Sequence, residues 1–124
     1  MAWLVRDGDV LASLEIAESF RDRTRGLLGR DAMTGAILLR PARSVHTLRM
    51  RFAIDVAFCD EDLEVLKTAT IQPNRLARTV WKARSVIEAE AGAFEAWSLA
   101  VGDHLAIKGD ELTAGGSMSS SSDP

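Results

Sequence analysis

The sequence predicts a mostly β domain of the α+β class, with a barrel-like antiparallel sheet and one principal α-helix near residues 20–28. Three observations support this prediction. Short apolar runs recur along the chain at regular spacing, turn signals separate them, and one segment has a strong helical pattern. The length of 124 residues, with 47% hydrophobic and 27% charged residues, is typical of a single domain with one core.

The chain opens with a predicted β-hairpin. Residues 3–6 and 10–17 are apolar-rich runs on either side of Asp7-Gly8-Asp9. Glycine takes a positive φ without steric cost, so Gly8 permits the tight turn that joins two antiparallel strands.

The principal helix is predicted to follow this hairpin, at residues 20–28. Ser19 and Asp22 stand at the spacing of a capping box, in which a hydroxyl and a carboxylate satisfy backbone N–H groups at a helix start. The next apolar residues recur on one helical face, and Gly29 stands where the helix would end.

The rest of the chain is predicted to form five more strands and one or two helical turns. The second hairpin is the clearest local pattern, because two apolar-rich runs flank the acidic turn Asp60-Glu61-Asp62. The strands are predicted at residues 36–39, 52–59, 63–71, 86–90 and 104–108, and the helical turns within residues 93–99.

The chain divides into one domain and one tail. Residues 1–108 contain no internal repeat and no linker, so they are predicted to fold as one unit. Residues 109–124 are rich in glycine and serine, and they have too little apolar surface to offset the entropy of ordering them. We therefore expect a disordered C-terminal tail.

The charge of the domain is balanced. The chain has 15 Lys and Arg against 18 Asp and Glu, and three of those acids lie after residue 108, where no Lys or Arg stands. Residues 1–108 are thus neutral, 15 minus 15. Proteins that bind nucleic acid or membrane surfaces depend on a large excess of cations, so we expect neither partner.

Cysteine use and the N-terminus favour a cytoplasmic protein. Cys59 is the only cysteine, which excludes an intramolecular disulfide and a cysteine-cluster metal site. The first residues carry charges by Arg6 and lack the apolar stretch of a signal peptide. No run approaches the roughly 18 apolar residues that a membrane-spanning helix needs.

A single carboxylate stands in the most apolar run of the chain. The period of two in a strand puts Asp55 on the face opposite to Ile54, Val56 and Phe58. A carboxylate buried alone is too costly, so Asp55 must face water, pair with another group or serve a site.

Four blocks of the chain resemble the bacterial and archaeal domain of unknown function 192 (DUF192). They are RGLLGR at 25–30, VHTLRM at 45–50 with IDVAF at 54–58, VIE at 86–88 with Gly92, and VGD at 101–103. Their order and spacing match across almost all of residues 1–108. Many members have Met where this chain has Leu28, and an aromatic residue where it has Leu48. The resemblance implies a compact pseudo-barrel with a mixed, strongly folded sheet and one helix, and it implies no activity and no cofactor.

Five polar residues from these blocks are candidates for one site: Arg25, His46, Thr47, Asp55 and Glu88. In a functional interpretation they line a cleft, where His46 acts as general base or ligand donor and Arg25 holds an anionic group. In a structural interpretation they form a network that holds the helix on the sheet. The structural interpretation is favoured, because polar networks that fix one packing are common.

Other sites have weaker support. The two histidines, His46 and His104, lack the paired spacing that binds zinc, so no metal is expected. No glycine loop of the phosphate-binding type occurs, so no cofactor is expected. A Cys-His nucleophile is disfavoured because Cys59 ends an apolar strand.

The basic residues also define a candidate contact surface. Arginines are in excess between residues 21 and 51, and four bases without an acid lie between residues 75 and 84. Arg49, Arg51 and the exposed-type Trp81 are the candidate contacts. The favoured interpretation is that the basic stretches face opposite ways and balance the acidic turn.

Two functions stay open. The favoured one is a non-catalytic binding or accessory domain that contacts a small ligand or a protein partner near His46 and Asp55. The alternative is a hydrolase-like acid-base enzyme that uses His46 with Asp55 or Glu88. The sequence does not indicate the ligand, the partner or the oligomeric state.

Overall fold

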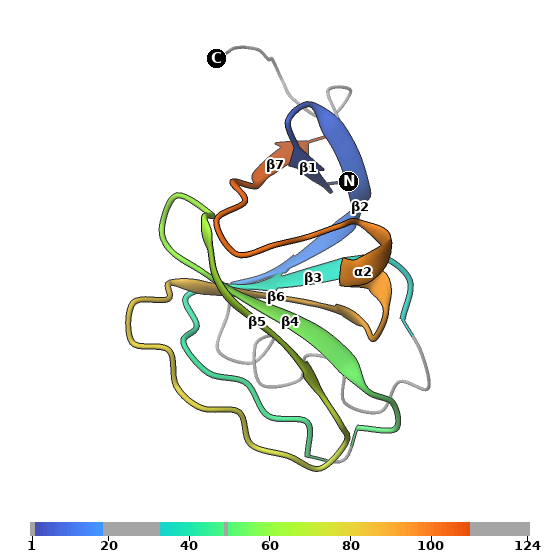
Figure 1. The fold of residues 1–124 in the computed structure, drawn as a ribbon, viewed down its shortest axis with the longest axis vertical. Helices are drawn as coiled ribbons and strands as arrows, with labels where there is room; N and C mark the ends of the chain where they lie inside the picture. The colour runs from blue at the N-terminus through green and yellow to red at the C-terminus, as the bar shows by residue number, and fades with distance from the viewer. Residues whose placement is uncertain (1, 19–32, 49, 110–124) are drawn as a thin grey trace.

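A computed structural model describes residues 2–18, 33–48 and 50–109 of the chain. Seven strands form one sheet in the order β5-β4-β6-β3-β2-β1-β7 (Figure 1). The strands are β1 (Ala2–Arg6), β2 (Asp9–Ala17), β3 (Ala36–Leu39), β4 (Ile54–Cys59), β5 (Val65–Ile71), β6 (Ser85–Glu90) and β7 (Ala106–Gly109). The predicted mostly β architecture is confirmed.

The one helix within the described residues is α2 (Ala93–Ala96), which falls inside the predicted helical turns. The helix predicted at residues 20–28 lies outside the described part of the chain, and so does the predicted tail beyond Gly109. Within the described ranges, no helix combines the length and apolar character that crossing a membrane requires.

The first hairpin forms as predicted. Its turn residues Asp7 and Gly8 have φ of 52° and 85°. A two-residue turn with positive φ at both positions matches the twist of the strands that it joins. The next connection is longer and makes β2 and β3 parallel neighbours, whereas all other strand pairs are antiparallel. The sheet is therefore mixed.

The second hairpin joins β4 to the edge strand β5. Its turn is held by Asp60, whose Oδ1 accepts the backbone N–H groups of Asp62 and Glu64 at 2.9 Å each. All six residues of β4 are buried, because β4 lies between β5 and β6. This central position explains why its sequence is almost continuously apolar.

The sheet has two packed faces. We call the side with Ile54, Val56 and Phe58 the first face, and the side with Ala57 and Cys59 the second face. The β3–β4 connection supplies Val45 and Met50 to the core on the first face, and the β5–β6 connection supplies Ala83. Phe94 of α2 and strands β1 and β2 pack on the second face. Asp55 belongs to the second face, as the period of two predicts.

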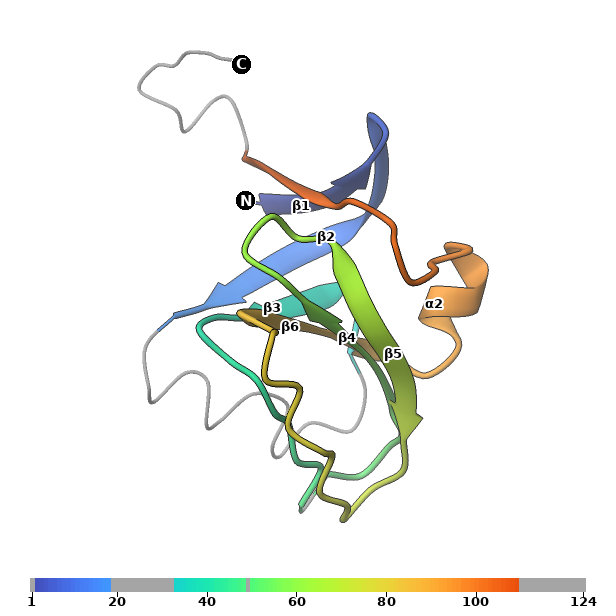
Figure 2. The ribbon, with the colours of Figure 1, turned by 60° about the vertical axis from the view of Figure 1, so that its left-hand side comes forward.

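The sheet is strongly folded, as the pseudo-barrel prediction expects, and it is not closed. Its edge strands, β5 and β7, form no ladder with each other. Among the residues of β5, only the first is hydrogen-bonded through its backbone to the described segment before β7. Val65 donates to the Asp103 carbonyl at 2.9 Å and accepts from the Gly102 N–H at 2.8 Å. The chain then turns away to pair with β1 (Figure 2). Most of β5 therefore stays an edge.

Candidate functional site

Asp55 is fully provided with hydrogen-bond donors. Its side chain is 4% exposed. One carboxylate oxygen, Oδ1, accepts the hydroxyl of Thr70 on the neighbouring strand β5 at 2.6 Å. The other, Oδ2, accepts the backbone N–H groups of Gly92 and Phe94 at 3.0 and 3.1 Å. Asp55 thus ties the start of α2 to the sheet, which is a structural role.

A cavity of about 240 Å³ lies beside Asp55, on the second face. Its polar lining consists of Asp55, Thr68, Thr70 and Glu95, with no Lys or Arg. Both Asp55 oxygens are already engaged, and the two carboxylates repel an anion. The part of the chain that the structure describes holds no group of three or more His, Cys, Asp and Glu placed to bind a metal ion.

Glu88 lies on the opposite side of the sheet from Asp55. It is 3% exposed, and its cross-strand neighbours Ile37 and Val56 place it on the first face. Burial raises the pKa of the Glu88 carboxyl to about 7. Among the described residues its carboxyl has no hydrogen-bond or ion-pair partner. Asp55 and Glu88 therefore do not form one cluster.

His46 and Thr47 lie in a connection that covers the first face. His46 forms an isolated antiparallel bridge with Leu76, and it is exposed while its neighbours Val45 and Thr47 are buried. Its imidazole thus points away from the sheet, and it meets neither Asp55 nor Glu88. The sequence places His46 and Asp55 in one block and Glu88 in another, and it does not determine where their side chains point.

Thr47 organises the turn after β5. Its hydroxyl donates to the Gln72 carbonyl at 2.6 Å and accepts the backbone N–H of Arg75 at 2.9 Å. Its backbone adds two bonds to this turn, from the Thr47 N–H to the Arg75 carbonyl and from the Asn74 N–H to the Thr47 carbonyl. Thr47 therefore fixes the position of residues 72–75 against the sheet.

The remaining candidates are scattered. Arg25 and Arg49 lie outside the described residues. Arg51 is exposed, and so is Trp81, at 75%. Cys59 is 0% exposed, and burial, with a smaller contribution from Asp60, raises the pKa of its thiol to about 12. A thiol so protonated and so enclosed is a poor nucleophile.

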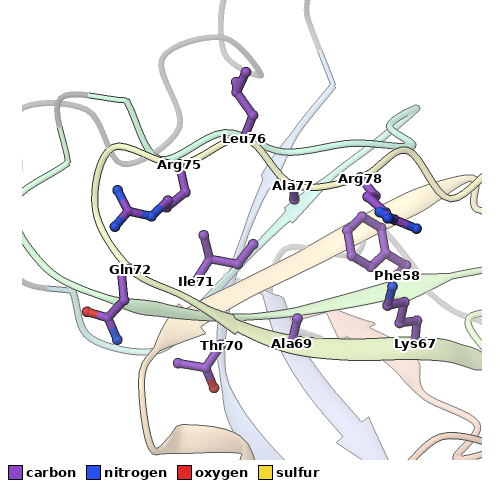
Figure 3. A pocket seen from close by; sticks show the side chains of 10 residues that line it. All are labelled: Phe58, Lys67, Ala69, Thr70, Ile71, Gln72, Arg75, Leu76, Ala77 and Arg78. Atoms are coloured by element: carbon purple, nitrogen blue, oxygen red, sulfur yellow. The ribbon is translucent and has the colours of Figure 1, made fainter.

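A second pocket, of about 320 Å³, lies between β5 and residues 72–78 (Figure 3). Apolar side chains from three segments form its floor and one wall. They are Phe58 of β4, Ala69 and Ile71 of β5, and Ala77 of the connection, whereas the Leu76 side chain points away from the pocket and is 76% exposed. In Figure 3, Ala69 and Ile71 point toward the connection, while Thr70 points to the other face.

Three cations surround this apolar surface. Lys67 is the cross-strand neighbour of Phe58, and it lies at the end of the pocket where Figure 3 also shows Arg78. Arg75 lies at the other end, beside Gln72. Its Nη1 donates only to the backbone carbonyls of Pro73 and Asn74, at 3.4 and 3.2 Å. Within the described residues, none of the three has a carboxylate partner.

The sequence contains a partial signal for this pocket. The basic stretch that begins at Arg75 is visible, but its relation to β5 is not, because the connection after Ile71 has no regular structure. One face of the predicted strand at residues 63–71 carries a cation beside apolar side chains, namely Lys67, Ala69 and Ile71. Only the fold shows that Arg75 and Arg78 return to that face.

Comparisons with known proteins agree with one another. The model of the family DUF192, described as an uncharacterized ACR, matches residues 3–107. The UPF0127 protein of Pyrococcus furiosus is 32% identical over 102 residues, which cover 78% of this chain and 88% of that protein.

Two solved structures share the fold. A protein of unknown function from Novosphingobium aromaticivorans has a TM-score of 0.71 at 16% identity, over 85% of this chain and 82% of that one. A proposed transcription regulator from Sinorhizobium meliloti has a TM-score of 0.72 at 21% identity, over 85% of this chain and 90% of that one. At these identities the likeness concerns the fold alone.

Proposed function

The chain belongs to the DUF192 family, whose description is that of an uncharacterized group, and we propose that it is a non-catalytic binding domain. Its ligand has an apolar body and an anionic group, and this group is a carboxylate. The ligand occupies the pocket between β5 and residues 72–78. This proposal moves the site of binding away from His46 and Asp55, which were favoured from the sequence.

One observation carries the proposal: Lys67, Arg75 and Arg78 surround an apolar floor and have no carboxylate partner among the described residues. Neighbouring cations repel one another, so a cluster of three without an acid favours an anion. A guanidinium also matches a carboxylate with two parallel hydrogen bonds.

The size and lining of the pocket support a specific class of ligand. A volume of about 320 Å³ lies at the low end of small-molecule sites. Phe58 and Ile71 offer apolar contact, which a fully hydrated inorganic ion does not use. An organic acid, or an acidic group attached to a larger chain, uses both the floor and the cations.

The alternative, an acid-base hydrolase, has less support. Asp55 uses both carboxylate oxygens to hold Thr70 and α2. His46 points away from the sheet, and Glu88 is buried on the first face. A general base and its orienting carboxylate need hydrogen-bond contact, and these side chains lie apart.

The test uses matched pairs of probes that differ in charge alone. Phenylacetate is compared with phenylacetamide, and hexanoate with hexanamide, by amide-resonance NMR on the full chain. We expect each acid to shift the resonances of residues 67–71 and 75–78, while the neutral amide leaves them unchanged at the same concentration. Equal shifts by acid and amide, or shifts only around Gly92 and Glu95, would overturn the proposal.

A pair of variants adds a control for charge. Arg78→Gln removes one cation of the pocket, whereas Arg84→Gln removes an exposed cation that does not line it. The account predicts weaker binding of phenylacetate by about threefold for the first variant, because an exposed ion pair contributes about 0.2–1 kcal/mol. The second variant should bind as the wild type does.

A further inference from the structure

We propose that the anionic group belongs to an extended acidic peptide, which adds to the sheet as a strand along the free edge of β5. This inference rests on the proposed function, and it names the source of the ligand. The peptide places its acidic side chains against Lys67, Arg75 and Arg78, and an apolar side chain between them in the pocket.

The edge of β5 is available over most of its length. The strand has one neighbour, β4. Its first residue, Val65, is bonded to residues 102–103, and the carbonyl of Gln72, which follows the strand, accepts the Thr47 hydroxyl. Between these two points, residues 66–71 make backbone hydrogen bonds to β4 alone among the described residues. Half of the backbone groups of such an edge point outward without a partner.

The free edge and the pocket adjoin each other. Lys67, Ala69 and Ile71 line the pocket from β5 itself, on the first face. A strand added beside β5 would point every second side chain to the same face, about 5 Å further out. Those side chains would meet Arg75 and Arg78 at the mouth of the pocket. Backbone pairing then supplies affinity, while the pocket selects the side chains.

Charge favours an acidic partner over a second copy of this chain. Two β5 strands paired antiparallel would bring both sets of the cations Lys67, Arg75 and Arg78 to one face of the joined sheet. Like charges on neighbouring strands destabilise a pairing. A peptide with carboxylates at alternate positions turns the same contacts into attraction.

The probes are heptapeptides, acetyl-Thr-Asp-Thr-X-Thr-Glu-Thr-amide, in which X is each aliphatic residue, Met or Phe. The Asp, X and Glu side chains lie on one face of an extended chain. Binding to the full chain is measured by calorimetry, and exchange of the amide protons of residues 66–71 is measured with and without peptide. Phenylacetate and phenylacetamide are measured alongside.

The expected result has three parts. At least one acidic peptide binds about tenfold more tightly than phenylacetate, because it adds backbone pairing. Its Asn and Gln counterpart binds more weakly than the acidic form. Amide protons on the outer edge of residues 66–71 exchange about tenfold more slowly in the complex, since new hydrogen bonds protect them.

Methylation of the peptide backbone tests pairing directly. Alternate N–H groups of a strand point to opposite edges, so two isomers are made, each with methyl groups on one set. The isomer whose methyl groups replace the N–H groups facing β5 should lose binding, and the isomer methylated on the outer edge should keep it. Lys67→Glu weakens peptide binding by about tenfold, whereas Lys108→Glu, at the opposite edge of the sheet, changes it less than about twofold.

The outcomes separate the inference from the proposed function. One outcome is that phenylacetate binds more tightly than phenylacetamide while no peptide binds more tightly than phenylacetate. In that case the ligand is a free organic acid, so the peptide inference is overturned and the proposed function stands. Equal binding of the two methylated isomers overturns strand addition as well. If neither acids nor peptides bind, both proposals fail. Dimerisation of the unliganded chain with protection of residues 66–71 would assign the edge to a second copy instead.

Discussion

Removal of the Asp55 carboxylate should destabilise the fold strongly without unfolding it. In Asp55→Ala, the buried N–H of Phe94 loses its acceptor, which costs about 1–3 kcal/mol. The Gly92 N–H and the Thr70 hydroxyl also lose an acceptor, but the cavity of about 240 Å³ beside them admits water. Those two losses cost about 0.5–1.5 kcal/mol each. We expect a total near 4 kcal/mol, or a melting temperature lower by about 15 °C.

The isosteric change Asp55→Asn should be much milder. The amide oxygen can take the place of Oδ2 and accept both backbone N–H groups, while the amide nitrogen donates to the Thr70 hydroxyl oxygen. Only the charge assistance is lost, at about 1 kcal/mol. Urea unfolding followed by circular dichroism measures both free energies, with the exposed Asp9→Ala as control. Alanine and asparagine variants of equal stability would refute the assigned geometry.

Three further predictions concern other buried groups. Burial raises the pKa of Glu88 from 4.5 to about 7, so the wild type should lose stability as the pH rises from 4.5 through 7. Near about pH 8, Glu88→Gln should then be more stable than the wild type by up to about 3 kcal/mol, and near about pH 4 the two proteins should be equally stable. If the unfolding free energies of the two proteins changed in parallel with pH across this range, the prediction would be contradicted. Cys59, with its pKa raised to about 12, should resist iodoacetamide in the folded protein and react once guanidinium unfolds it; rapid labelling of the native chain would show otherwise. Thr47→Val should lower the unfolding free energy by about 2 kcal/mol and weaken binding of phenylacetate, and Thr47→Ser should restore both, as calorimetry can verify.

The strands could be predicted from the sequence because their signals are local. The turn at Asp7-Gly8 and the acidic turn after Cys59 lie directly between apolar runs, so both hairpins follow from neighbouring residues. The face of Asp55 also follows from the period of two. What the sequence could not predict is that the sheet stays open, because that depends on where residues 102–105 leave β5.

The candidate site shows the same limit. Of the three possibilities that the sequence leaves for Asp55, the structure shows pairing, and the donors are Thr70 and the backbone at the start of α2. Almost every residue has a backbone N–H, so the sequence does not indicate which of these groups donates to Asp55. Likewise, the residue of β6 that pairs with Asp55 is Ala89, and Glu88, one residue earlier, therefore points to the opposite face. Which residues pair depends on the register of the two strands, and the sequence does not determine that register.

Binding of phenylacetate to two multiple variants tests the central claim most directly. One variant, Lys67→Gln with Arg75→Gln and Arg78→Gln, neutralises the pocket; the other, His46→Ala with Asp55→Asn, changes the pair suggested by the sequence. If the pocket holds the anion, the first variant loses at least about tenfold in affinity and the second stays within about twofold of the wild type. The reverse order, with binding lost only in the second variant, would contradict the account.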